Sequence, residues 1–140
     1  MERRCVITGM GAVTPVGNDV DTTWENIKNG VNGIGYITKF DTEEFKVKIA
    51  GEIKDFNAEL YVEKKDLKRN DMFSIIAIAA AQQAFDMAGL VKGEIKEEEA
   101  ERFGCIVGSG IGGFLTLENQ VGRVLEKGPG KISPLFIPMA

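Results

Sequence analysis

The chain has 140 residues, a formal net charge of −4, 44% hydrophobic residues and 27% charged residues. This composition is typical of a globular domain that is long enough to bury a core. The acidic balance argues against a nucleic-acid partner, and the sequence shows neither a membrane-spanning apolar stretch nor a signal peptide. We therefore expect a cytoplasmic protein without a membrane partner. The absence of histidine excludes Ser–His and Cys–His nucleophile pairs and histidine metal sites within the chain.

The first predicted element is a short buried strand at Cys5–Ile7, followed by a tight turn at Gly9 and Gly11. A dinucleotide-binding fingerprint would carry a third glycine at position 14 and begin a helix there, but this chain has Thr14 and Pro15. Proline also disfavours a helical conformation for the residue before it. The pattern therefore predicts a strand and a turn that do not hold a pyrophosphate.

Two further elements are predicted before the middle of the chain. Thr22 and Glu25 have the spacing of a capping box, which predicts a helix that begins there and stops at Gly30. Residues 47–53 alternate loosely between apolar and polar side chains, which predicts a strand or one arm of a hairpin.

The clearest helix is predicted over residues 72–88, where apolar side chains recur every three or four positions. Asp71 is its predicted N-cap and Gly89 its stop. The alanine-rich run from Ala77 to Ala84 predicts close approach to a neighbouring backbone. The charged residues 93–102 that follow are expected to form a solvated loop or a short surface helix.

The last third of the chain predicts a second buried strand at 103–107, a glycine-rich turn at Gly108–Gly113 and a helix over 114–125. The order strand, helix, helix, strand, helix predicts an α/β layered domain with some parallel pairing. Residues 132–140 are apolar and interrupted by proline, so they would expose an apolar patch unless another surface covers them. This end of the chain indicates a fragment of a longer protein.

The two cysteines, Cys5 and Cys105, fall inside the two predicted core strands. Free cysteine is among the most buried residue types and packs as a small hydrophobic side chain. We therefore predict two structural thiols without a disulfide.

The turn Gly108–Gly113 formally matches the dinucleotide-binding pattern G-x-G-x-x-G. The acidic residue expected about 20 positions later is missing from any strand end, because Glu126 lies at the end of a predicted helix. The structural alternative is a turn whose glycines let a helix pack closely against a sheet. A Rossmann-type NAD(P)-binding domain that uses this turn stays open as the alternative function.

The side chains otherwise offer little chemistry. Ser109, Thr14 and Ser133 have no base near them in sequence and are not predicted nucleophiles. Glu97–Glu99 is a surface run, and no spacing typical of metal ligands is present. The basic run Lys64–Arg69 in an acidic chain is either a solvated helix face or a docking site for an acidic partner.

Seven segments in the same order give the chain its resemblance to a known family. They are RRCVITGMGAVTPVGN, WENIKNGVNGI, FDTEEF, AGEIKDFN, KRNDMF, GSGIGG and KISPLFIP. Together they resemble the N-terminal part of the β-ketoacyl-acyl carrier protein synthases, and the synthase II branch is the nearest fit.

The resemblance implies a thiolase-like fold of layered α-β-α type, of which residues 1–140 would be most of the N-terminal half. It implies a homodimeric acyltransferase that elongates fatty acyl chains by decarboxylative Claisen condensation with malonyl-acyl carrier protein. The substrates would be phosphopantetheine thioesters, and no cofactor is implied. The catalytic cysteine and two histidines of the family would lie beyond Ala140, so we expect no catalytic residue here and an inactive fragment.

The resemblance also implies contacts with substrate and partner. Ile111 and Phe114 resemble positions that line the acyl pocket, and Phe136 resembles an aromatic residue that reaches the partner subunit's pocket. The basic patch that receives acyl carrier protein is matched by Lys65, Lys68, Arg69 and Lys131.

Two positions depart from the family pattern. Gly130 stands where an arginine is common, which affects one contact of the basic patch around Lys131. Phe114 stands where a smaller leucine is usual, which predicts a shorter acyl pocket.

Besides the condensing-enzyme fragment and the Rossmann-type domain, a third interpretation is a stand-alone module that binds acidic carriers without chemistry.

Overall fold

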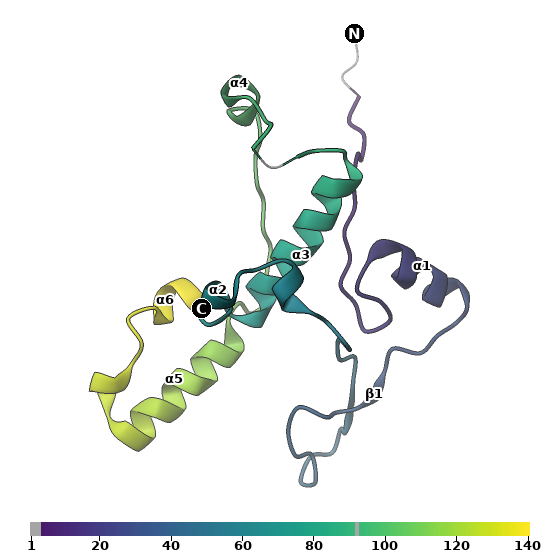
Figure 1. The fold of residues 1–140 in the computed structure, drawn as a ribbon. Helices are drawn as coiled ribbons and strands as arrows, with labels where there is room; N and C mark the ends of the chain where they lie inside the picture. The colour runs from purple at the N-terminus through teal and green to yellow at the C-terminus, as the bar shows by residue number, and fades with distance from the viewer. Residues whose placement is uncertain (1–3, 92) are drawn as a thin grey trace. The chain divides into compact units, whose positions relative to one another are not determined.

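The computed structural model describes residues 4–91 and 93–140. Contacts divide the chain into two compact units: unit 1 is Met1–Asn57 with Ala80–Val91, and unit 2 is Ala58–Ala79 with Lys92–Ala140. Helix α3 (Met72–Met87) contributes its first half to unit 2 and its second half to unit 1 (Figure 1).

Unit 1 contains helix α1 and a minimal hairpin besides the second half of α3. Helix α1 spans Val20–Lys28, and strands β1 (Gly35–Tyr36) and β2 (Ile49–Ala50) pair in antiparallel fashion. Gly35 lies opposite Ala50, and Tyr36 lies opposite Ile49. The hairpin arm predicted over residues 47–53 is confirmed, but this pairing is antiparallel rather than the parallel type that the element order suggested.

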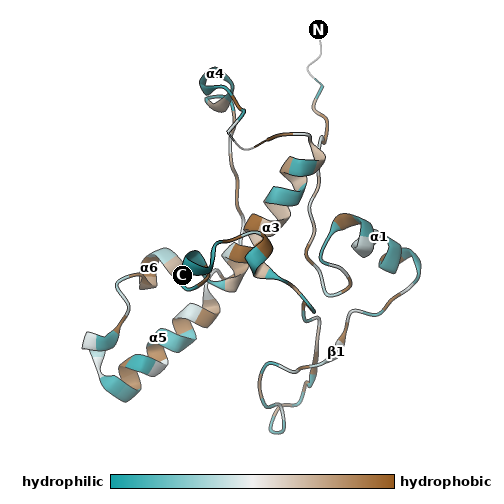
Figure 2. Ribbon diagram, in the orientation of Figure 1, coloured by the Kyte–Doolittle hydropathy of each residue, from teal (hydrophilic) through white to brown (hydrophobic). Residues whose placement is uncertain are grey.

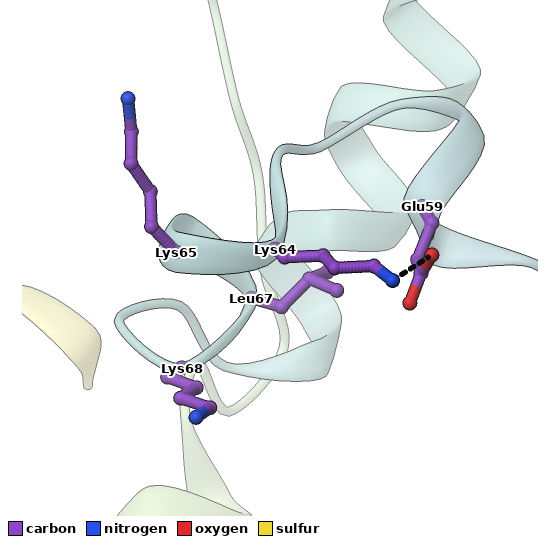
Figure 3. Close-up of a pocket in the computed structure, with 5 residues that line it drawn as sticks. All are labelled: Glu59, Lys64, Lys65, Leu67 and Lys68. Atoms are coloured by element: carbon purple, nitrogen blue, oxygen red, sulfur yellow. Dashed lines mark ion pairs between the residues drawn. The ribbon is translucent and has the colours of Figure 1, made fainter.

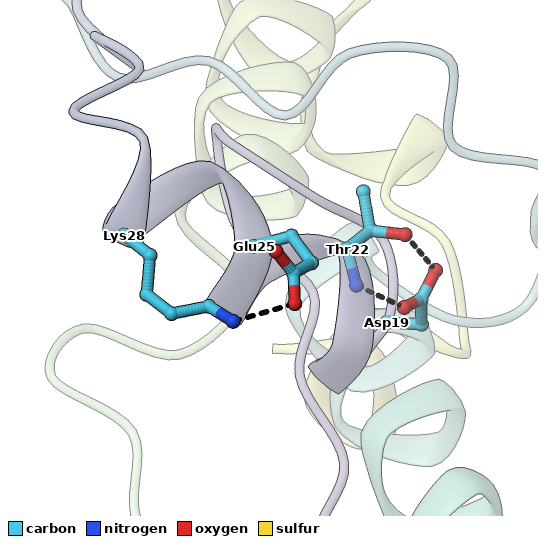
Figure 4. A network of polar contacts seen from close by, with 4 residues as sticks. All are labelled: Asp19, Thr22, Glu25 and Lys28. Atoms are coloured by element: carbon cyan, nitrogen blue, oxygen red, sulfur yellow. Dashed lines mark hydrogen bonds and ion pairs between the residues drawn. The ribbon is translucent and has the colours of Figure 1, made fainter.

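Helix α1 begins three residues earlier than its capping box indicated (Figure 4). Its N-cap is Asp19, whose carboxylate accepts the backbone N–H of Thr22 at 2.7 Å and its hydroxyl at 2.8 Å. The backbone and hydroxyl hydrogen bonds from Thr22 lower the pKa of Asp19 below its ordinary value. The far end is as predicted, because Gly30 has a left-handed φ of 67°.

The opening segment of unit 1 packs its backbone directly on α3. A Cβ atom added to Gly11 would overlap the carbonyl group of Ala80 and lie 2.6 Å from its carbon, and one on Gly9 would overlap the Ala84 carbonyl oxygen. The backbone N–H of Ala12 also donates to Oε1 of Gln83 on α3 at 3.0 Å. The close backbone approach predicted from the alanine run is therefore confirmed.

The turn predicted at Gly9 and Gly11 is wrong, because these glycines serve the approach to α3 instead. The chain turns at Thr14–Gly17, where the backbone N–H of Thr14 donates to the Gly17 carbonyl at 2.7 Å and the Gly17 N–H returns a bond at 3.2 Å. The Thr14 hydroxyl also accepts the N–H of Val16 at 3.2 Å. Pro15 lies in the middle of this turn, where its fixed φ is favourable.

The two predicted core strands are not strands in the described chain. Residues 5–7 and 103–107 have no strand ladder, and their side chains are exposed, with Ile7 at 83% and Ile106 at 101%. Cys5 and Cys105 are consequently exposed thiols, not buried ones. The physical reason is that a strand forms only by pairing with a second strand, and among the described residues neither segment takes part in such a pairing.

Unit 2 is helical, with a small core on α3. Ile75 is 3% exposed and Ala79 is fully buried. Figure 2 shows that α3 is largely apolar, whereas apolar and polar residues alternate along the second long helix of this unit, α5 (Phe114–Lys127). The remaining elements are short: η1 (Ala58–Leu60), α2 (Lys64–Leu67), α4 (Glu97–Ala100), η2 (Pro129–Lys131) and α6 (Phe136–Met139).

The predicted helices of unit 2 are confirmed to within two residues. Helix α3 ends at Met87, and Gly89 follows with a left-handed φ of 71°. Helix α5 extends to Lys127 and stops at Gly128, which has a φ of 84°. Across residues 4–91 and 93–140, the helices are too short or too polar to cross a bilayer.

Candidate functional site

The basic run forms a compact helical turn in unit 2. Helix α2 starts after Glu63, whose carbonyl accepts the N–H of Asp66 at 2.8 Å. The Asp66 carbonyl in turn accepts the backbone N–H of Arg69 at 3.0 Å and the side-chain amide of Asn70 at 2.9 Å. These bonds hold the residues between Lys64 and Asn70 in one continuous helical turn.

A groove of about 410 Å³ lies against this segment (Figure 3). Its lining residues are Glu59, Lys64, Lys65, Leu67 and Lys68. The groove therefore combines three ammonium groups with one apolar side chain and one carboxylate. It gathers two of the predicted docking residues, Lys65 and Lys68, whereas Arg69 follows directly in the chain.

Two of the lysines already have counterions within the unit. Lys64 Nζ lies 3.2 Å from Oε2 of Glu59, and Lys65 Nζ lies 2.8 Å from Oε2 of Glu63. In the part of the chain that the structure describes, Lys68 and Arg69 have no ion pair. A carboxylate of a partner would therefore compete with a counterion at Lys64 and Lys65, but not at Lys68 or Arg69.

The predicted acyl-pocket residues occupy two different places in unit 2. Phe136 lines an apolar cavity of about 230 Å³ against α5, together with Leu117, Gln120, Val121, Val124, Leu125 and Ile132. Ile111 and Phe114 do not line this cavity and are 78% and 56% exposed. The structure therefore does not bring the three predicted pocket residues into one cavity.

Ile111 and Phe114 are instead positioned by the glycine-rich turn before α5. The hydroxyl of Ser109 accepts the N–H of Gly112 at 2.9 Å, and Gly112 has a left-handed φ of 74°. The backbone N–H of Gly113 donates to the Ala140 carbonyl at 2.8 Å. A Cβ atom on Gly113 would lie 2.7 Å from the Met139 carbonyl oxygen, so this position requires glycine.

Lys131, the remaining predicted docking residue, lies in the short helix η2 and is exposed. Its backbone N–H donates to the carbonyl of Gly128 at 3.2 Å, which places it directly after the end of α5. It is not part of the groove around α2. Gly130, the departure from the family pattern, leaves Lys131 as the side-chain cation of this turn.

Asp71 lies between the basic segment at residues 64–70 and helix α3, and it also contacts the start of α5. It is 7% exposed, and its Oδ2 atom accepts the backbone N–H of Thr116, in the first turn of α5, at 2.8 Å. Burial raises the pKa of its carboxyl, but hydrogen bonds from Thr116 and from the first turn of α3 outweigh burial, so the pKa lies below its ordinary value. The N-cap predicted for α3 is therefore also a cap of α5.

Metal chemistry has no support in residues 4–91 and 93–140, where His, Cys, Asp and Glu side chains form no group of three or more that could hold a metal ion.

Sequence reasoning missed Glu59 and the second role of Asp71. Glu59 lies five residues before its partner Lys64, and Thr116 lies 45 residues after Asp71. A sequence motif covers only neighbouring positions, so neither the Glu59–Lys64 pair nor the Asp71–Thr116 pair could be recognised from a local pattern.

The chain was compared with known protein families and with individual proteins. The model of the "Beta-ketoacyl synthase, N-terminal domain" family matches residues 2–140. The 3-oxoacyl-[acyl-carrier-protein] synthase 2 of Staphylococcus aureus (strain COL) is 50% identical over 137 residues, which are 98% of this chain and 32% of the relative. The synthase 2 of Synechocystis sp. is 44% identical over 138 residues, 99% of this chain and 32% of that protein.

Solved structures agree on the fold. The ishigamide ketosynthase/chain length factor superposes with a TM-score of 0.76 at 27% identity, covering 94% of this chain and 32% of that one. A type II PKS acyl-carrier protein in complex with its ketosynthase bound to the hexaketide gives a TM-score of 0.72 at 23% identity, covering 96% and 34%. These likenesses confirm the thiolase-like fold class.

The chain spans about a third of the length of the curated relatives it matches. The matches give the Rossmann alternative no support, and at the end of this turn Gly113 packs closely against the backbone of Met139 and Ala140. Because the family model extends over residues 2–140, this chain belongs to the β-ketoacyl synthase N-terminal domain family.

Proposed function

We propose that this chain is the N-terminal part of a 3-oxoacyl-acyl carrier protein synthase that elongates fatty acyl chains. The observation that carries the proposal is 50% identity over 98% of the chain with a protein named for this activity. The groove with Lys65 and Lys68 supports an acidic carrier as the partner, because a cationic surface steers the encounter with an acidic protein.

The reaction takes place in two steps: the acyl group first moves from the carrier thiol to an enzyme thiol, and a carbon–carbon bond then replaces that new thioester bond. An enzyme thiolate attacks the acyl thioester and releases the carrier thiol. Malonyl carrier then loses carbon dioxide, and its carbanion attacks the acyl-enzyme carbonyl, which forms 3-oxoacyl carrier and frees the enzyme thiolate. This chain has no histidine to stabilise the developing charges, so its own contribution is docking and acyl binding.

In this proposal Lys65, Lys68, Arg69 and Lys131 receive the acyl carrier protein, while Ile111, Phe114 and Phe136 contact the acyl chain. The protein is a cytoplasmic homodimer that needs no cofactor beyond the carrier's phosphopantetheine.

The direct test is the reaction of the intact protein that carries this chain. Incubated with acyl carrier and malonyl carrier, it is expected to form one 3-oxoacyl carrier for each carbon dioxide released, as followed by mass spectrometry and radiolabel. If malonyl carrier is left out, no product should form. Tight carrier binding without any product would instead support the stand-alone interaction module.

Phe114→Leu is expected to shift the preference of the intact enzyme toward longer acyl chains. Leucine is smaller than phenylalanine, and about one methylene group in an apolar pocket changes discrimination by about 10-fold. The measurement is kcat/KM for medium and long acyl carriers in both proteins. Equal wild-type rates with the two chain lengths, unchanged by the substitution, would contradict a role for Phe114 in setting the pocket depth.

A further inference from the structure

Asp71 stands out as a carboxylate that caps two helices at once. The N-cap of α5 is Gly113, which has no side chain to accept the free N–H groups of the first turn. Asp71 supplies the missing acceptor to Thr116 at 2.8 Å while its main-chain carbonyl accepts the N–H of Ser74 at 3.1 Å in α3. A carboxylate near two helix N-termini is favoured by both helix dipoles.

The packing around this carboxylate is tight. A Cβ atom on Gly113 would lie 3.1 Å from Oδ2 of Asp71, so the start of α5 is held against the carboxylate without space for a side chain. Thr116 is only 6% exposed, and its side chain is among the groups that lower the pKa of the Asp71 carboxyl. An ordinary N-cap of α3 would need none of these contacts with α5.

Asp71 lies close in sequence to the docking residues and, through Thr116, close to the acyl-pocket residues. It follows Arg69 by two residues, and Asn70 between them is bonded back to Asp66 at 2.9 Å. On the other side, Thr116 follows Phe114 by two residues, in the helix that begins after Ile111. One buried carboxylate therefore connects the cationic segment to the turn that carries Ile111 and Phe114.

We propose that Asp71 is a positioning residue that sets the distance between the carrier-docking segment and the acyl-pocket turn. The inference rests on the proposed function, because both sites are assigned there. An acyl chain tethered to a docked carrier reaches the pocket only if the tether matches this distance. A free acyl-pantetheine is not docked, so it is insensitive to the same distance.

The test compares these two substrates in the intact enzyme. We expect Asp71→Asn to lower kcat/KM about 10-fold with acyl carrier and less than twofold with acyl-pantetheine of the same chain length. Carrier affinity, measured by titration, should stay within twofold because Lys68 and Arg69 are untouched. Thr116→Val removes only the hydroxyl and keeps the backbone donor, so a smaller loss of about threefold is expected, again with the carrier substrate alone.

Asp86→Asn is the matched control, since it removes the same charge from an exposed position at the other end of α3. It should leave both substrates unchanged. Equal losses with the two substrates in Asp71→Asn and Thr116→Val would overturn the proposal, and so would no loss with either. Failure of the proposed function looks different, because the wild-type enzyme would then give no product from acyl carrier at all.

Discussion

Gly11→Val is expected to unfold unit 1 at markedly lower urea concentration, with a loss of about 3 kcal/mol or more in the free energy of unfolding. The added Cβ would overlap the carbonyl group of Ala80, whose Cα atom is only 2.9 Å from the Cβ position. The obstacle is helix backbone, which cannot rotate away as a side chain can. The opening segment must then separate from α3, and the bond from Ala12 to Gln83 is lost with it.

Fluorescence of Trp24 is a suitable measurement, because the chain has one tryptophan and it lies on α1 within unit 1. Gly35→Ala is the matched control: no atom lies within 4 Å of its Cβ position, so stability should change by less than about 0.5 kcal/mol. Adding Ala80→Gly to Gly11→Val should not restore stability, since the clash involves the main chain. A urea midpoint in Gly11→Val equal to that of the wild type would show that the segment does not pack on α3.

The helices could be predicted from sequence, because their signals are local. Periodic apolar residues and a following glycine located α3 and α5 to within two residues, and Gly30, Gly89 and Gly128, which follow the helix ends, each have a positive φ that favours glycine. Helix α1 was displaced because Asp19 and Thr22 both compete for the N-cap, and a carboxylate that bonds both groups of Thr22 prevails.

The strands were predicted less well, because the hairpin arm at residues 47–53 is confirmed but the two buried strands are wrong. An apolar run such as residues 5–7 indicates that a segment is extended and covered, but the partner that covers it lies elsewhere in the fold. Gly9 and Gly11 show the same difficulty, because a glycine needed for a turn and one needed for close packing look identical in sequence. Only the position of Ala80 and Ala84 on α3 distinguishes the two.

For the candidate site, too, local features could be predicted from the sequence and long-range contacts could not. The charge of residues 64–69 was evident from composition, whereas the pairing of Lys64 with Glu59 depends on how η1 lies against α2. Asp71 was recognisable as a cap of its own helix, but its bond to Thr116 spans 45 residues. Sequence reasoning therefore finds the residue types, and the structure decides which of them act together.

The ion pairs around α2 predict which cations contribute most to binding an acidic partner. A partner carboxylate that binds Lys64 must compete with Glu59 at 3.2 Å, and one that binds Lys65 must compete with Glu63 at 2.8 Å. Lys68 and Arg69 have no such competitor in residues 4–91 and 93–140. Their substitution should therefore weaken docking more than that of Lys64 does.

Lys68→Glu combined with Arg69→Glu is expected to weaken binding of acyl carrier protein about 100-fold at low salt. Each reversal removes an attraction of about 0.2 to 1 kcal/mol and adds a repulsion of similar size, so two reversals together can cost up to about 4 kcal/mol, where 1.4 kcal/mol is a factor of ten. The loss should shrink as salt is added, because these groups are exposed. The measurement is carrier affinity of the intact protein at 20 and 300 mM salt, about 20 Å and 6 Å of Debye screening respectively.

Lys96→Glu combined with Arg102→Glu is the control, since it changes the net charge equally at exposed positions that flank α4. If general attraction between a carrier and the whole protein governed binding, both double variants would lose affinity to the same extent. A groove that receives the carrier predicts a large loss for the first pair and at most a twofold loss for the second. Comparable losses would therefore exclude the groove around α2 as the docking site, while leaving the acyl-pocket assignment of Ile111 and Phe114 to its own test.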